Sequence, residues 1–254
     1  MNRTIFFLAF TICCVIAVFF LPAIPQDAAY HRFADNRTFF NIPNFYNVIS
    51  NIPFIIIGFV GLIHFFKTET LTFATLARVT LFAGVMLIGF GSGYYHWQPS
   101  NFSLVWDRIP MAIVFMSFFS IVIGAYINPK WGRVILIPFI MLGIGSVLRW
   151  YASEQAGHGD LRLYVLVQFY PMLAIPLIVF LFPASRRMRL EMVTLIVLYA
   201  VAKLVEYKDQ EIFQTLTISG HSLKHLFAAG AVLMMLQMTA PLRKSTLKFP
   251  SQQF

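Results

Sequence analysis

The stretch Val79-Thr-Leu-Phe-Ala-Gly-Val-Met-Leu-Ile-Gly-Phe-Gly-Ser92-Gly-Tyr-Tyr-His96 decides the fold of this chain. It is mostly apolar and nearly as long as the roughly 20 residues that cross the hydrocarbon core of a bilayer as a helix. Its last turns contain the hydroxyl of Ser92 and the imidazole of His96, and Asp107 follows eleven positions after His96. Because ionisable groups at a membrane boundary are costly, this polar end marks a candidate functional site.

The composition of the whole chain agrees with a membrane location. Of its 254 residues, 59% are apolar and only 11% are charged, whereas soluble domains carry about 25% charged residues. The apolar runs lack the short alternating segments of an outer-membrane barrel. We therefore expect an all-α polytopic membrane protein.

The net charge of +9 is distributed among short connections, with no soluble basic domain to carry it. This distribution indicates membrane topology rather than a nucleic-acid partner. Cys13 and Cys14 are adjacent inside an apolar run, so they supply neither a disulfide framework nor a CxxC metal site. Nothing in the sequence identifies a protein partner.

Eight apolar segments are predicted to span the membrane. The first is longer than the apolar region of a signal peptide and lacks a clear cleavage site, so we expect a retained helix. The domain prediction is an N-terminal transmembrane helix over 1–24, a catalytic bundle over 25–242 and a cytoplasmic tail over 243–254. The predicted spans are approximately Ile5–Leu21, Val48–Phe66, Val79–His96, Ile109–Ile127, Val134–Trp150, Tyr164–Phe182, Met192–Val205 and Ile218–Met238.

Basic residues gather in alternate connections. By the positive-inside rule this pattern places both termini in the cytoplasm, which requires an even number of spans. His96 then closes the third span, Asp107 opens the fourth and His221 opens the eighth, all at the non-cytoplasmic face. The basic residues on the cytoplasmic side are Arg3, Lys67, Arg78, Lys130, Arg133, Arg186, Arg187, Arg189, Arg243, Lys244 and Lys248.

His221 and His225 stand four residues apart, so on a helix both imidazoles project from one face and can bind one metal ion. Alone, this pair fits a histidine that hydrogen-bonds between helices equally well. His96 at the same depth adds a third donor, and three histidines with one open position form a known catalytic zinc arrangement. Iron, manganese and cobalt stay open from ligand type alone.

Ser92 and Asp107 are the other candidate catalytic residues. Ser92 lies one turn below His96 and suits either close helix packing or donation to a metal-bound water or developing oxyanion. Asp107 can interact with its own helix dipole or with Arg108. It can instead act as a general base or orient a histidine.

Further polar residues have structural interpretations. Lys203, Glu206 and Asp209 recur at near-helical spacing, which favours an ion-pair ladder. The acidic residues Asp27 and Asp35 fall in the first outer loop, where a solvated loop is favoured over a hard-cation site. We do not expect His64 or His158 to be metal ligands.

Taken together, four ordered motifs resemble those of the alkaline ceramidases, within the membrane hydrolase superfamily that also contains the adiponectin receptors and the Per1-like proteins. The resemblance extends from about residue 30 to about residue 236. The motifs are Phe45-Tyr46-Asn47-Val-Ile-Ser50-Asn51, Ser92-Gly-Tyr-Tyr-His96, Asp107-Arg-Ile-Pro110-Met111 and His221-Ser-Leu-Lys-His225.

The resemblance implies a seven-helix ceramidase-like bundle, here with one extra N-terminal transmembrane helix. It also implies a zinc-dependent amidase that cuts the N-acyl bond of ceramide, a membrane lipid, into a sphingoid base and a fatty acid. Zinc would be held by His96, His221 and His225, with Ser92 and Asp107 assisting the water and the intermediate. Eukaryotic members bind calcium partly through a Glu at the position of Asn44, so calcium is not carried over to this chain.

The substrate pocket is expected among the helices, lined by residues such as Phe90, Tyr94, Phe118 and Tyr170. Two other functions stay open: a metal-dependent hydrolase of another acyl lipid, such as an ester phospholipid or an N-acyl amino lipid, and a non-enzymatic receptor or transporter. Short loops and compact length suit a bacterial-type member in an inner membrane, although an endoplasmic-reticulum or Golgi location would satisfy the same charge rule.

Overall fold

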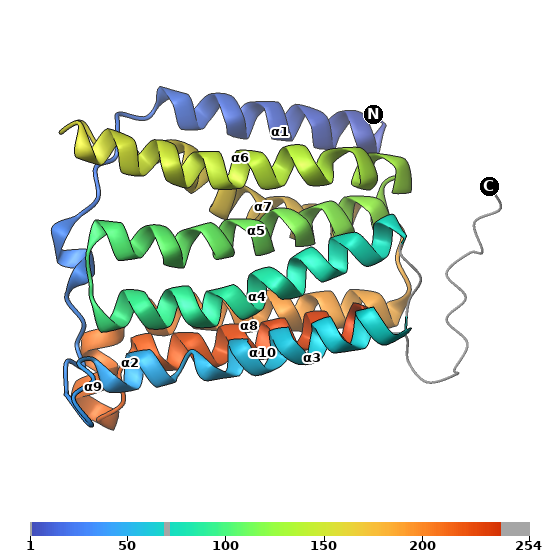
Figure 1. The fold of residues 1–254 in the computed structure, drawn as a ribbon. Coiled ribbons are helices and arrows are strands. Elements are labelled where there is room, and N and C mark those ends of the chain that lie inside the picture. Colours follow the sequence, from blue (N-terminus) through green and yellow to red (C-terminus); the bar gives the residue numbers. More distant parts are fainter. Residues whose placement is uncertain (1, 69–71, 240–254) are drawn as a thin grey trace.

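The computed structural model describes residues 2–68 and 72–239, and the described part is all-α. Long helices lie side by side in a bundle (Figure 1). Their bounds are α1 Arg3–Phe20, α2 Phe45–Ile49, α3 Ile52–Thr68, α4 Phe73–Trp97, α5 Asn101–Tyr126, α6 Pro129–Gln155, α7 Arg162–Leu181, α8 Arg186–Tyr207, α9 Asp209–Leu216 and α10 Gly220–Thr239, with a 3₁₀ helix η1 over Ala28–His31. The predicted tail over 243–254, with its three basic residues, lies outside the described residues.

Six segments of the described chain are long and apolar enough to cross a membrane, so the protein is an integral multi-pass membrane protein. They are Arg3–Phe20, Phe45–Lys67, Phe73–Trp97, Asn101–Tyr126, Pro129–Gln155 and Arg162–Leu181. The helices α8 and α10 pack against each other in the same bundle. They are more polar, because α8 carries several charged residues and α10 begins with the candidate site. That these two also cross the membrane remains a prediction.

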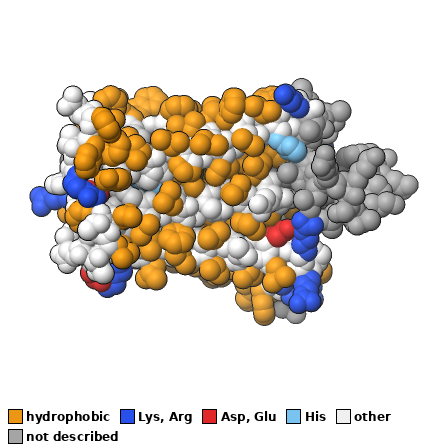
Figure 2. Space-filling model, turned by 90° about the horizontal axis from the view of Figure 1, so that it is seen from below, with side chains coloured by type: hydrophobic (Ala, Val, Ile, Leu, Met, Phe, Trp, Pro, Cys, Tyr) orange, Lys and Arg blue, Asp and Glu red, His pale blue; other side chains and the backbone are white. Residues whose placement is uncertain are grey.

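The surface of the bundle matches this location. Figure 2 shows a face whose middle is covered by hydrophobic side chains, with charged side chains toward its two ends. On α3, for example, Ile56, Phe59 and Val60 are exposed although all are apolar. In water such a surface would be an aggregation liability, whereas lipid tails solvate it.

The start of α5 differs from the predicted span. Ser100 and Ser103 form a reciprocal capping box that begins the helix at Asn101. Asp107 therefore lies in the second turn of α5 instead of opening it. The reason for the difference is that the cap is polar and lies outside the apolar run from which the span was predicted.

A close approach of α4 and α5 fixes the depth of the site. A Cβ atom at Gly91 would overlap the carbonyl oxygen of Trp106, so only glycine allows the two backbones this contact. Because Ser92 and Asp107 each follow one of these two residues, the contact brings both side chains together.

Candidate metal centre and cavity

Three histidines meet at one end of the bundle, His96 from the end of α4 and His221 and His225 from the first turns of α10. All three are buried, and one ring nitrogen of each lies within 4.8 Å of those of the other two. The Nε2 atoms of His96 and His221 are 3.3 Å apart. The expected convergence is confirmed, whereas His64 and His158 lie outside the cluster.

This spacing fits a metal ion. Nitrogen ligands 2.0–2.1 Å from a tetrahedral zinc ion are separated from one another by about 3.3 Å. His96 Nδ1 is buried without a hydrogen-bond partner, which leaves this ring held mainly by packing and by its Nε2 contacts. The donor set can therefore hold a metal, although three imidazoles alone do not distinguish zinc from iron, manganese or cobalt.

Ser50 determines which nitrogen of His225 faces the cluster. Its hydroxyl lies 3.1 Å from the Asn47 carbonyl and 2.7 Å from His225 Nδ1. With the hydroxyl donating to that carbonyl, Nδ1–H of His225 donates to Ser50, and Nε2 keeps its lone pair for a ligand bond. A second contact of this kind is typical of metal-binding histidines. Sequence reasoning missed the role of Ser50, although the residue belongs to a quoted motif.

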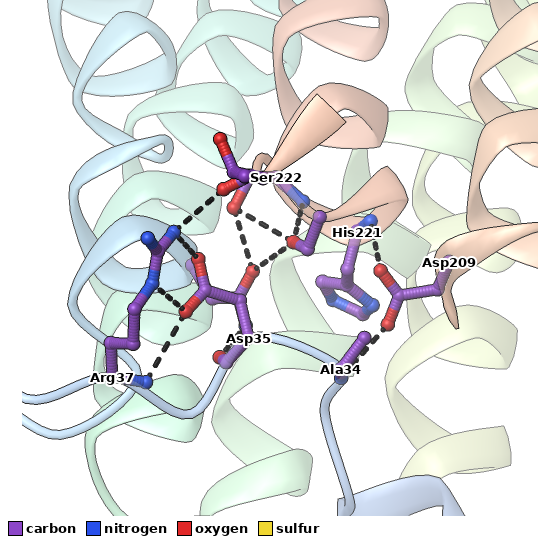
Figure 3. Close-up of polar contacts among 9 residues, drawn as sticks. Ala34, Asp35, Arg37, Asp209, His221 and Ser222 are labelled. Atoms are coloured by element: carbon purple, nitrogen blue, oxygen red, sulfur yellow. Dashed lines mark hydrogen bonds and ion pairs between the residues drawn. The ribbon is translucent and has the colours of Figure 1, made fainter. Parts of the chain in front are cut away.

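The first turn of α10 is held by two side chains from other elements. The Asn47 side-chain oxygen accepts hydrogen bonds from Ser219 at 3.0 Å and Ser222 at 2.7 Å. Asp209 accepts the backbone N–H of His221 at 2.8 Å and that of Ala34 at 3.2 Å (Figure 3). The expected ladder is thus wrong for Asp209, which caps α10 instead.

The other two members of that ladder do pair, because Lys203 Nζ lies 2.5 Å from Glu206 Oε2. Lys224 extends the pair, with its Nζ 2.9 Å from Glu206 Oε1 and 2.9 Å from His221 Nε2. A metal ion would take the same lone pair of His221, which would leave Lys224 with Glu206 as its partner. The sequence showed Lys224 only as an unassigned residue between the two histidines.

The loop before α2 closes the cluster from outside. The Phe33 ring centroid lies 4.7 Å from that of His96 and 5.1 Å from that of His221. Asp35 is 1% exposed and forms an ion pair of 2.6 Å with Arg37, which also donates to the Thr217 carbonyl at 2.8 Å. The prediction of a solvated loop is wrong for Asp35, because Arg37 neutralises the buried carboxylate (Figure 3).

The other residues considered for a cation site also have protein partners. Asp27 accepts the backbone N–H of Ala29 at 2.8 Å, and Asn44 donates to the His96 carbonyl at 2.8 Å. Asn44 therefore supports the backbone of a candidate metal ligand.

Ser92 and Asp107 are both buried, and their side chains lie next to each other in the cavity lining. No ion pair joins Asp107 to Arg108 within residues 2–68 and 72–239, so that interpretation of Asp107 is wrong. The hydroxyl of Ser92 therefore lies beside a carboxylate and near the histidine cluster.

A cavity of about 560 Å³ opens beside this pair, and its lining includes Ser92, Asp107 and His225. Farther from the cluster its walls are apolar. Eleven positions separate Asp107 from Phe118, both on α5 and both in the lining, so the cavity extends about 16 Å along that helix. The remaining apolar lining includes Met111, Val114, Phe115, Ile175, Leu195, Ala228, Val232 and Met235.

Of the four lining residues expected from the sequence, Phe118 is confirmed. Phe90, Tyr94 and Tyr170 lie outside the lining formed by the described residues. Phe90 is 56% exposed on the outer surface of α4, and Tyr170 bonds Thr11 of α1. The aromatic residues of a span face both lipid and core, and the sequence does not tell these faces apart.

Comparison with known proteins agrees with this geometry. The family model described as Ceramidase matches residues 37–252. No curated protein matches the chain. The family match takes in α2 to α10, the three histidines, the Ser92–Asp107 pair and the cavity. Since it covers most of the sequence, the chain belongs to the Ceramidase family.

Proposed function

We propose that the protein is an intramembrane zinc-dependent amidase that hydrolyses the N-acyl bond of ceramide-like lipids to a sphingoid base and a fatty acid. One observation carries the proposal: the three-histidine cluster and the Ser92–Asp107 pair meet at the polar end of a long apolar cavity. Membership of the Ceramidase family supports amide hydrolysis. An apolar cavity with a few polar groups at one end is typical of a lipid-tail site.

In this mechanism the acyl chain lies along α5 and α10, with its amide beside Asp107. His96, His221 and His225 hold the zinc ion, which when bound supplies an activated water and polarises the amide carbonyl. Asp107 accepts the proton of the attacking water and passes it to the leaving nitrogen, as a general base and then a general acid. Ser92, which lies beside that carboxylate, orients it by donating a hydrogen bond during the reaction.

We further propose that α8 and α10 cross the membrane beside the other six spans and that the cluster faces the non-cytoplasmic side. Residues 1–24 would be a retained first helix and 25–242 the catalytic bundle. Two features support this. The helix α1 begins and α10 ends at the end of the bundle opposite to α2 and α9 (Figure 1). That end carries basic residues and, among the described acids, only Glu191, which suits a cytoplasmic face.

The decisive experiment incubates the detergent-purified protein with N-acyl and O-acyl lipids, with and without a chelator. We expect amide hydrolysis that the chelator abolishes and zinc restores, and about one zinc per chain. A preparation that is free of metal and still hydrolyses lipid would contradict the mechanism. Preference for O-acyl lipids would instead assign the site to ester substrates, and transport into liposomes without product would indicate a transporter.

Two variants test the residues. His221→Ala should remove both zinc and activity, because the cluster loses one donor. Asp107→Asn should keep zinc but lose on the order of 10²–10⁴-fold in kcat, the usual contribution of a general base. The matched control is His158→Ala, an exposed histidine outside the cluster. If Asp107→Asn loses zinc as well, Asp107 orients a ligand instead.

A further inference from the structure

Arg108 is a buried cation that forms no ion pair within the described part of the chain. Arg108 follows Asp107 on α5, lines the cavity and is 5% exposed. Nη2 donates to the side-chain oxygen of Gln26 at 2.6 Å. Nη1 is buried and has no hydrogen-bond partner. Within the described part of the chain, no carboxylate lies at ion-pair distance from this guanidinium.

Three acidic residues line the same cavity, and their closest polar contacts are with residues other than Arg108. Asp107 lies beside Ser92, and Asp27 accepts a backbone N–H. Glu206 is shared by two lysines, Lys203 and Lys224. Among the described residues, none of these three carboxylates forms an ion pair with Arg108.

Aromatic rings surround Arg108 but do not replace an anion. Its guanidinium carbon lies 4.2 Å from the Trp150 ring centroid, 4.8 Å from that of Tyr164 and 5.6 Å from that of Tyr30. These faces attract the cation and fix its plane. They offer no acceptor to Nη1, and a buried donor without a partner is costly and rare in folded proteins. A ligand in the cavity can supply the missing acceptor.

We propose that Arg108 binds an oxyanion on the headgroup of the lipid, a phosphate or a carboxylate, and so selects acidic N-acyl lipids over neutral ceramides. The inference rests on the proposed function, since it concerns the headgroup of the same substrate. A guanidinium pairs with both groups through two parallel N–H···O bonds. Asp107, the neighbouring residue, works on the amide, so the oxyanion lies a short distance from the bond that is cut.

The test compares three N-acyl lipids with the same acyl chain, whose headgroup is a free alcohol, a phosphate monoester or a carboxylate. For the zinc-loaded wild-type protein we expect kcat/KM for one of the acidic lipids to exceed that for the alcohol about tenfold or more, as for a charge-assisted hydrogen bond. The better acidic lipid identifies the headgroup. Equal values for all three, or a preference for the alcohol, overturn the inference.

Two substitutions locate the effect. Arg108→Gln should bring the acidic-to-neutral ratio of kcat/KM close to one, and Arg108→Lys should restore part of it because the charge returns without the paired geometry. The control is Arg149→Gln, which removes the same charge from an exposed position on α6 and should leave the ratio unchanged. An unchanged ratio in Arg108→Gln overturns the inference.

A binding measurement tests the anion site independently of the proposed amidase activity. It also provides a test if Arg108→Gln does not fold. Tetradecyl phosphate should raise the melting temperature of the wild-type protein more than tetradecanol does, and this difference should shrink in Arg108→Lys. If no lipid is hydrolysed but the difference is present, the amidase proposal fails and the anion site stands. Equal shifts with both compounds overturn the anion site.

Discussion

At the scale of single residues, the contact between Ser50 and His225 offers a direct test of the candidate metal centre. The hydroxyl lies 2.7 Å from Nδ1 of the ring, and without it the ring can turn and change its tautomer. We expect Ser50→Ala to weaken zinc binding about 10–100-fold, as for other partners of metal-binding histidines. Titration with a competing chelator measures this affinity.

Ser146→Ala is the matched control for this prediction. Ser146 is also buried, but it lies within α6 and its hydroxyl donates to the Gly143 carbonyl of that helix at 2.7 Å. Both variants lose a buried hydroxyl, and only one loses a contact with the cluster. If the two bind zinc equally well, Ser50 does not orient His225.

Single residues also show what the sequence can reveal about the site. His221 and His225 are predictable because helical spacing puts them on one face, and span boundaries put His96 at the same depth. Ser50 lies 175 positions from its partner His225, and no periodic pattern connects the two. That Arg108 forms no ion pair among the described residues is likewise invisible in sequence, because it depends on how the helices place the acids of the cavity.

At the scale of helices, the contact of α4 with α5 depends on one glycine. Gly91→Ala should lower both the melting temperature and the hydrolytic rate, because the added methyl group pushes the backbone of Trp106 away and separates Ser92 from Asp107. Thermal unfolding in detergent and lipid hydrolysis measure the two effects.

Gly93→Ala in the same helix is the matched control. A Cβ atom there meets nothing within 4 Å, so alanine should be neutral or stabilise by up to about 1 kcal/mol through its better helix propensity. If both alanine variants behave alike, the close approach at Gly91 does not position the site.

The junction of α1 with α7 gives a prediction on pH. Arg162 bonds both carboxylate oxygens of Asp160, at 2.9 and 2.8 Å, and donates to the Leu21 carbonyl at the end of α1. The bonds from Arg162 hold the pKa of Asp160 below its ordinary value of 3.8. A carboxylate with a lowered pKa stabilises the fold above the ordinary pKa, and this contribution is lost as the pH falls through the lowered value.

The wild-type protein should therefore melt at a higher temperature than Asp160→Asn at pH 5–7. The difference between the two melting temperatures should disappear as the pH falls below 3.8. Thermal unfolding in detergent over this range measures it. Glu211→Gln breaks an exposed ion pair with Lys208. Its melting temperature should stay close to that of the wild-type protein at any pH, as for most surface pairs. A gap for Asp160→Asn that persists at low pH contradicts the role of its charge.

Helices were more predictable than their ends. Each predicted span overlaps a long helix, since a long apolar run has little alternative to a helix in lipid. The polar caps were not predictable from hydropathy, and α5 begins earlier than its apolar run. The short helix α9 lies between two predicted spans, and α2 begins just before a predicted span and overlaps its start. Neither was predicted as a separate helix, because such short helices gain their stability from packing, here against α10 and α4.

At the scale of the whole molecule, the orientation of the bundle can be measured across α6. Lys130 lies at one end of this helix and His158 just beyond the other, and both are exposed. With Cys13 and Cys14 replaced by serine, we expect a membrane-impermeant thiol reagent to label His158→Cys in intact cells and Lys130→Cys only after lysis. The reverse pattern would place the cluster on the cytoplasmic side.

The polarity of α10 bears on how the membrane protein is made. Of the described helices α10 leaves the ribosome last, and it brings two imidazoles to the one that α4 already holds. A segment that opens with His221, Lys224 and His225 enters hydrocarbon poorly alone, so its insertion relies on α3 and α8, against which it packs. A nascent chain therefore has no complete catalytic centre, and the proposed lipid-cleaving activity begins only when synthesis of the bundle has ended.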